Sequence, residues 1–153
     1  MENSHINESI LSEQILEDMK ENLSDWSDEE EISRYLRALL HKEAFDHAGL
    51  IYGMGHAVYS LSDPRARIFR SFVEKLSAEK EFALYDAVSR LAPKIIADER
   101  QIYKGVSPNV DFYSGFAYSM LGLPVELYTP IFAIARIAGW SAHRLEEVAI
   151  NGK

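Results

Sequence analysis

A histidine stands directly behind two glycines in the stretch GMGHAVYSLSDPRA, which begins at Gly53. This placement makes His56 a candidate for a side chain that contacts a ligand. Glycines at positions 53 and 55 would let the backbone approach a ligand closely. A single Gly-x-Gly is a weak signal, and no flanking strand supports a dinucleotide-binding loop. A purely structural histidine is the alternative.

Arg65 follows Asp63 and Pro64, which read as the N-cap and the first position of a helix. A cation in the first turn works against the helix dipole. Together with the free N–H groups of that turn, the guanidinium would form a pocket for a carboxylate or phosphate. The alternative is an exposed arginine balanced by Asp63. We expect Arg67 and Arg70 to lie in solvent.

Two further charged residues stand in unusual places. Asp111 occupies a predicted helix start, where it either caps the helix or serves as a general base. Arg136 lies inside the very apolar stretch PIFAIARIAGWSA, where a buried guanidinium needs an anionic partner. That partner is either an acid of the same chain or a bound carboxylate.

Helical periodicity dominates the chain, and alternation typical of strands is absent, so we predict an all-α protein. Ser27 is the expected N-cap of the second helix, and Pro93 is expected to kink or split the fourth. A glycine within the fifth helix marks a point where another element can pack closely. The predicted helices cover residues 12–23, 27–44, 64–76, 77–103, 111–123 and 128–148.

The last predicted helix is apolar nearly all round, from Ile131 to Trp140. Such a helix is normally buried on all sides. A chain of 153 residues offers little to bury it, so we expect this helix to pack against another subunit or a missing part of the same protein. The isolated chain is then expected to self-associate through residues 128–140, and the sequence reads as a piece of a longer protein.

Composition excludes several classes of function. A net charge of −8 argues against a nucleic-acid partner. The chain has no cysteine, and its other four histidines lack the spacing of a helical zinc site, so we expect no metal. Neither a signal peptide nor a stretch long enough for a membrane helix is evident. We expect a soluble, cytoplasmic protein.

Three blocks, GMGHAVYSLSDPRA, PNVDFYSG and TPIFAIARIAGWSAH, resemble the C-terminal signature blocks of citrate synthases, in the same order. The resemblance runs from about Gln14 to Lys153. It implies a fragment of an all-helical, two-domain homodimer. Residues 14–122 would form the small domain, with residues 123–153 as an extra apolar helix that returns to the large domain. Residues 1–13 match nothing in the family.

The resemblance also implies roles for single residues. His56 would polarise the ketone of oxaloacetate, Asp111 would take a proton from acetyl-CoA, and Arg65 and Arg136 would hold carboxylates. Coenzyme A would be a co-substrate, with no permanently bound cofactor. Its expected wall consists of Leu50, Tyr52, Gly53, Met54, Gly55, Ala57 and Asn109.

The sequence departs from the family in one important respect. The family has a second catalytic histidine in a His-Gly-Gly-Ala-Asn segment, and this chain has none; His5 does not match it. A further family arginine, in an Arg-Pro context, would follow Lys153. We therefore expect an incomplete site that needs the rest of a citrate synthase. The alternatives are a 2-methylcitrate synthase, which uses propionyl-CoA, and a helical binding or oligomerisation module without catalysis.

Overall fold

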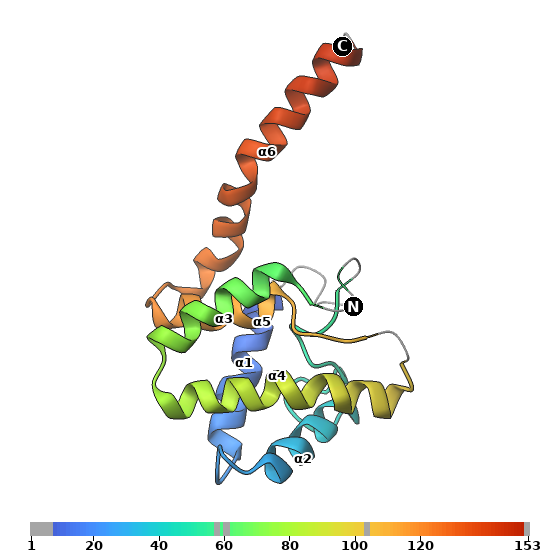
Figure 1. Ribbon diagram of the computed structural model, residues 1–153, viewed down its shortest axis with the longest axis vertical. Coiled ribbons are helices and arrows are strands. Elements are labelled where there is room, and N and C mark those ends of the chain that lie inside the picture. Colours follow the sequence, from blue (N-terminus) through green and yellow to red (C-terminus); the bar gives the residue numbers. More distant parts are fainter. Residues whose placement is uncertain (1–7, 57–58, 60–61, 103–104, 152–153) are drawn as a thin grey trace.

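The computed structural model describes residues 8–56, 59, 62–102 and 105–151. Within them it is all-α, as predicted, with a short 3₁₀ turn at Val125–Leu127 and no strand beyond one isolated bridge between Met54 and Pro108. Helices α1 to α5 form a body, and α6 rises away from it (Figure 1). The helices are α1 (Glu8–Asn22), α2 (Glu29–Leu40), α3 (Pro64–Leu76), α4 (Glu79–Arg100), α5 (Val110–Met120) and α6 (Tyr128–Asn151).

The core of the body forms where α1, α2, α4 and α5 turn their apolar faces toward one another. The apolar faces of α1 and α2 are buried, including Met19, Ile32 and Leu36. Tyr85 of α4 stacks on Phe116 of α5, with ring centroids 3.7 Å apart. Burying such side chains stabilises the fold by about 1.5–3 kcal/mol each before entropy is counted.

Helix α1 packs on α5 at backbone distance. A Cβ at Gly115 would lie 2.1 Å from the carbonyl oxygen of Ser9, so only glycine allows this approach. This confirms the close packing expected at a glycine of the fifth helix. The contact fixes the first turn of α1 against the second turn of α5.

Local signals located most helix ends. Asp63 is the N-cap of α3, with Pro64 in its first turn, as predicted. The N-cap of α2 is Asp28 rather than Ser27; its carboxylate accepts hydrogen bonds from two backbone N–H groups of the first turn. Pro93 does not split the fourth helix, because α4 continues through it from Glu79 to Arg100. A proline removes one backbone bond, and the bonds on either side hold the helix together.

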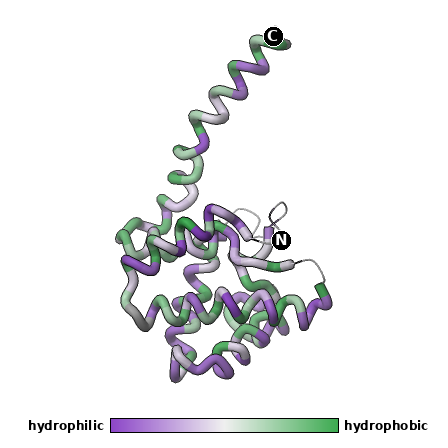
Figure 2. Tube along the Cα trace, viewed as in Figure 1, coloured by the Kyte–Doolittle hydropathy of each residue, from purple (hydrophilic) through white to green (hydrophobic). Residues whose placement is uncertain are grey.

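Beyond Phe132, helix α6 has no cover from the described part of the chain. Hydrophobic residues recur along its whole length (Figure 2), and Ile134, Ile137 and Trp140 are 69%, 61% and 56% exposed. Its first residue, Tyr128, is buried against the body, with its ring 5.1 Å from that of Tyr118. The expectation that α6 packs on something outside this chain stays a prediction.

None of the helices in the described residues combines the length and hydropathy required to cross a membrane.

Candidate active site

The glycine loop lies along the segment that leads into α5. The N–H of Gly55 donates to the carbonyl of Ser107 at 2.8 Å, and the N–H of Asn109 donates to the carbonyl of Gly53 at 2.9 Å. Gly53 has φ of +78°, and a Cβ there would lie 2.8 Å from Phe112. Its close approach is therefore to α5 of the same chain. Gly55, with φ of +86°, faces open space instead.

Asn109 is the N-cap of α5, and both polar atoms of its side chain form hydrogen bonds within the chain. Its Oδ1 accepts the N–H of Asp111 at 2.8 Å, while Nδ2 donates to the carbonyl of Gly55 at 3.0 Å and to Glu8 Oε2 at 3.3 Å. Of the two interpretations of Asp111, capping is thus wrong, because Asn109 caps the helix. Asp111 lies in the first turn, where the helix dipole favours a negative charge.

Asp63 joins the starts of α3 and α5. Its carboxylate is completely buried and accepts the backbone N–H of Arg65 at 2.9 Å and that of Val110 at 3.1 Å. Arg65 adds two side-chain bonds, Nε to Oδ1 at 3.0 Å and Nη2 to Oδ2 at 2.9 Å. Burial alone would raise the pKa of Asp63, but these bonds outweigh burial and lower it.

Arg65 therefore has the counter-ion that the structural interpretation predicted. Its side chain is nevertheless 45% exposed, because only one edge of the guanidinium faces Asp63. An arginine held on one edge can still meet an anion with the rest of its donors. Both interpretations of Arg65 are compatible with this arrangement.

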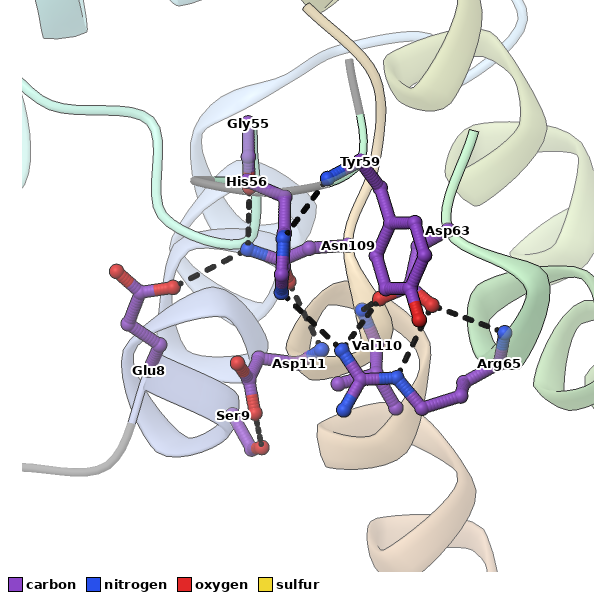
Figure 3. A network of polar contacts seen from close by, with 10 residues as sticks. All are labelled: Glu8, Ser9, Gly55, His56, Tyr59, Asp63, Arg65, Asn109, Val110 and Asp111. Atoms are coloured by element: carbon purple, nitrogen blue, oxygen red, sulfur yellow. Dashed lines mark hydrogen bonds and ion pairs between the residues drawn. The ribbon is translucent and has the colours of Figure 1, made fainter. Parts of the chain in front are cut away.

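His56 is oriented by two neighbours (Figure 3). Its Nδ1 accepts the backbone N–H of Tyr59 at 3.1 Å, and its Nε2 lies 3.3 Å from Arg65 Nη2. Because Nδ1 accepts, a neutral ring carries its proton on Nε2. A guanidinium only donates, so the 3.3 Å contact joins two donors. An oxygen placed beside both would accept from both.

The carboxylate of Asp111 faces the same region. Its Oδ1 accepts the hydroxyl of Ser9 at 2.9 Å, and its charge contributes to raising the pKa of Arg65, after the larger effect of Asp63. An imidazole N–H, a guanidinium and a carboxylate thus converge at the starts of α3, α5 and α1 (Figure 3). Together they can bind an anion, polarise a carbonyl and take up a proton.

Arg136 is the predicted residue that the structure does not bring to this group. It is exposed on α6 and has its guanidinium over the ring of Phe132, 5.0 Å from the centroid. Among the described residues no acid pairs with its guanidinium, and its burial stays a prediction, because it depends on what covers α6. Burial raises the pKa of Tyr118; the charge of Asp111 adds to this rise, and the charge of Arg136 opposes it.

The residues expected to line the coenzyme A site occupy the loop before His56. Leu50 is 43% exposed, and Tyr52 donates to Asp46 Oδ2 at 2.7 Å. Burial, together with this bond, raises the pKa of Tyr52 to about 12. Met54 is half-buried, and Ala57 lies outside the described residues. Gly53, Gly55 and Asn109 make the contacts within the chain given above. That these residues form a wall for coenzyme A stays a prediction.

One hollow of about 350 Å³ lies beside this group rather than in it. It opens between α3 and α4 and is lined by Arg67, Arg70, Asp86 and Arg90, with Asp63 at its wall. Arg70 and Arg90 both pair with Asp86 there. Neither His56 nor Asp111 lines it. Among the residues that the structure describes, no cluster could hold a metal ion.

Sequence reasoning missed two residues of the site, Glu8 and Ser9. They lie within residues 1–13, for which the sequence predicts no role, yet they begin α1 and contact Asn109 and Asp111. Nothing in the sequence signalled them, since a serine near a helix start is ordinary. Only the packing of α1 on α5 brings them to the site.

The sequence was compared with known proteins. The profile described as citrate synthase, C-terminal domain, matches residues 10–153. The chain is 45% identical over 101 residues to a citrate synthase of Synechocystis, covering 66% of this chain and 25% of that protein. It is 37% identical over 112 residues to 2-methylcitrate synthase 2 of Corynebacterium glutamicum, covering 71% of this chain and 27% of that protein.

Solved structures agree with these relatives. Citrate synthase of Thermoplasma acidophilum, in a ternary complex with carboxymethyl coenzyme A and oxaloacetate, superposes with a TM-score of 0.65 at 27% identity. The match covers 92% of this chain and 35% of that one. Measured against the Synechocystis protein and that of Deinococcus radiodurans, the chain spans only 25% and 26% of their length. The chain belongs to the citrate synthase family, and its matching part is the C-terminal domain.

Proposed function

We propose that this chain serves the citrate synthase reaction, in which acetyl-CoA, oxaloacetate and water give citrate and coenzyme A. The observation that carries the proposal is the convergence of His56 Nε2 and Arg65 Nη2, 3.3 Å apart, next to Asp111. Two neighbouring donors are matched by an acceptor oxygen that lies beside both. Oxaloacetate offers both a ketone oxygen and carboxylates.

Each residue then has a chemical task. Asp111 removes a proton from the methyl group of acetyl-CoA, and the enolate carbon attacks the ketone carbon of oxaloacetate. The ketone oxygen gains negative charge, is stabilised by the N–H of His56, and takes up one proton to become the hydroxyl of the product, which balances the proton removed from the methyl group. Arg65 holds a carboxylate of oxaloacetate, and Arg136 holds another once α6 is covered. Water then cleaves the thioester, which releases citrate and coenzyme A.

The residues present supply only part of this machinery. The sequence contains no His-Gly-Gly-Ala-Asn segment, so no second histidine is available to stabilise the enol. We propose that the remainder of a citrate synthase polypeptide supplies it, within a cytoplasmic homodimer. The loop around Gly55, which faces open space, is the proposed contact for coenzyme A.

The test is release of coenzyme A, followed with a thiol reagent, in the longest protein that the reading frame encodes. Asp111→Asn is expected to lower kcat by about 10²–10⁴, the usual contribution of a general base. Asp86→Asn is the matched control, because Asp86 also lies near arginines but outside the site. The 153-residue chain alone is expected to give the blank rate. No release from wild type, or equal loss in both variants, would refute the proposal.

A second candidate is 2-methylcitrate synthase, favoured by the 37% identity to the Corynebacterium glutamicum enzyme. Comparing kcat/KM for acetyl-CoA and propionyl-CoA in the same protein separates the two. A higher value for propionyl-CoA would favour the second candidate. Inactivity with both thioesters in a folded protein that still binds through α6 would favour a helical module without catalysis.

A further inference from the structure

Two buried hydroxyl groups form a chain that ends on Asp111. Ser9 of α1 is 0% exposed, and its Oγ lies 2.9 Å from Asp111 Oδ1 and 2.8 Å from Ser114 Oγ. A hydroxyl has one proton, and an ionised carboxylate only accepts. Ser9 therefore donates to Asp111, and Ser114 donates to Ser9. The direction of both hydrogen bonds is fixed by this argument.

The position of Ser9 is set by the backbone rather than by its side chain. Its carbonyl oxygen occupies the space over Gly115, where a Cβ would be only 2.1 Å away. One turn later, Ser12 donates to the main-chain oxygen of Asp111 at 2.9 Å. Two serines of α1 thus bind Asp111, one at its side chain and the other at its backbone.

The hydrogen bond from Ser9 helps to keep Asp111 apart from the oppositely charged Arg65. Asp111 lies close enough to Arg65 for the two to attract, and a direct ion pair would occupy both the base and the anion-binding group. Asp63 holds Arg65 with two side-chain bonds, while Ser9 holds one oxygen of Asp111. The other oxygen, Oδ2, takes no hydrogen bond from the residues that the structure describes.

We propose that Ser9 is a positioning residue, which holds Asp111 Oδ1 so that Oδ2 faces the substrate. The role of Asp111 as a base rests on the proposed function, but the hydrogen bond and its direction do not. Ser9 lies 102 positions from Asp111 in the sequence, and its role depends on α1 staying seated on α5.

The first test needs no substrate. With ¹³C-labelled aspartate, the Asp111 carboxyl signal is expected to shift between H₂O and D₂O, because deuterium replaces the Ser9 proton. Ser9→Ala is expected to remove this shift. Ser12→Ala is the matched control: it removes a buried α1 hydroxyl bonded to the same residue, but changes the backbone carbonyl signal instead. A carboxyl shift that survives Ser9→Ala, or disappears equally in Ser12→Ala, would overturn the proposal.

The second test measures catalysis in the longer protein. Ser9→Ala is expected to lower kcat about tenfold, since a carboxylate that rotates away misplaces the proton acceptor. The KM for oxaloacetate should stay unchanged, because His56 and Arg65 are intact. A rise in KM with unchanged kcat would overturn the positioning role. A wild-type protein without activity would refute the proposed function, while the carboxyl signal would still decide the hydrogen bond.

Discussion

Helices α5 and α6 have similar composition but opposite surroundings. Both are rich in apolar and aromatic residues, yet α5 is buried over most of its length, from Val110 to Ala117, while α6 is exposed beyond its first turns. Each also carries one charged residue of the expected site, Asp111 on α5 and Arg136 on α6. Asp111 is hydrogen-bonded to Ser9 and Ser12 of α1 and to Asn109, whereas Arg136 contacts the ring of its own helix neighbour Phe132.

The difference shows what the chain supplies by itself. The first turn of α5 is a finished piece of a site, because α1, α3 and the glycine loop all bind it within one polypeptide. Helix α6 carries an apolar surface whose partner is not among the described residues. The part of the proposed site on the body is therefore held in place within the chain, whereas the contribution proposed for Arg136 requires that α6 meets a partner.

The largest expected effect comes from the same substitution in the two helices. Gly115→Ala should destabilise the chain by more than about 3 kcal/mol, because its Cβ would meet the Ser9 carbonyl at 2.1 Å and α1 would have to move. Gly139→Ala is the control, since a Cβ there meets nothing within 4 Å. It should stabilise by about 0.5–1 kcal/mol through helix propensity. Urea unfolding measures both, and equal changes would contradict the contrast.

The next effect concerns the anchor between α3 and α5. Asp63→Asn should cost about 2 kcal/mol near neutral pH, because a buried carboxylate that accepts several bonds is lost. Asp86→Asn, whose arginine pairs lie at the surface, should cost about 0–1 kcal/mol. Free energies of unfolding from urea titrations compare the two.

The same anchor predicts a pH dependence. Since the folded-state pKa of Asp63 is lowered, its contribution is complete above its unfolded value of about 3.9 and disappears as pH falls through the folded value. The difference between wild type and Asp63→Asn should therefore shrink in acid. A difference that is constant with pH would show that the carboxylate is not the source.

The sequence predicted the body well because its signals are local. Helical periodicity located the six helices, and Asp63 with Pro64 marked a cap, since both depend on residues within one or two turns. The buried faces of α1 and α2 followed from the same periodicity. The predicted N-cap of α2 was wrong by one position, because Ser27 and Asp28 are both good caps. Which of them caps the helix depends on which side-chain oxygen reaches the free N–H groups.

The site was predictable only in part, because its partners are distant in the sequence. His56, Asp111 and Arg65 were identified by the resemblance together with their residue types. The hydrogen bonds of Asn109 to Glu8 and of Ser9 to Asp111 depend on how α1 packs on α5, and no local sequence pattern encodes that packing. The burial predicted for Arg136 stays untested, because an apolar helix indicates a partner without saying which chain contains it.

A smaller effect, of opposite sign to that of Asp63, is expected at Glu13 of α1. Burial raises its pKa despite the hydrogen bond from Tyr85, and its Oε1 has no hydrogen-bond partner in the part of the chain that the structure describes. A raised folded-state pKa means that stability is complete below the unfolded value of about 4.3 and is lost as pH rises through the folded value. Glu13→Gln should therefore raise the urea midpoint near pH 7 but not near pH 4. A variant that is less stable at both pH values would contradict this.

The smallest effect on the body is expected from α6, although its effect on assembly should be large. Ile134→Glu with Ile137→Glu places charges on side chains that are 69% and 61% exposed, so the free energy of unfolding should change by less than about 0.5 kcal/mol. Wild type should sediment as a concentration-dependent oligomer, and the variant as a monomer, because an apolar surface of this kind drives association. Glu146→Gln and Glu147→Gln, near the far end of α6, are the controls and should leave association intact. If wild type stays a monomer at high concentration, α6 does not bind a second copy of this chain. If the variant has a lower free energy of unfolding than wild type, α6 contributes to the stability of the body.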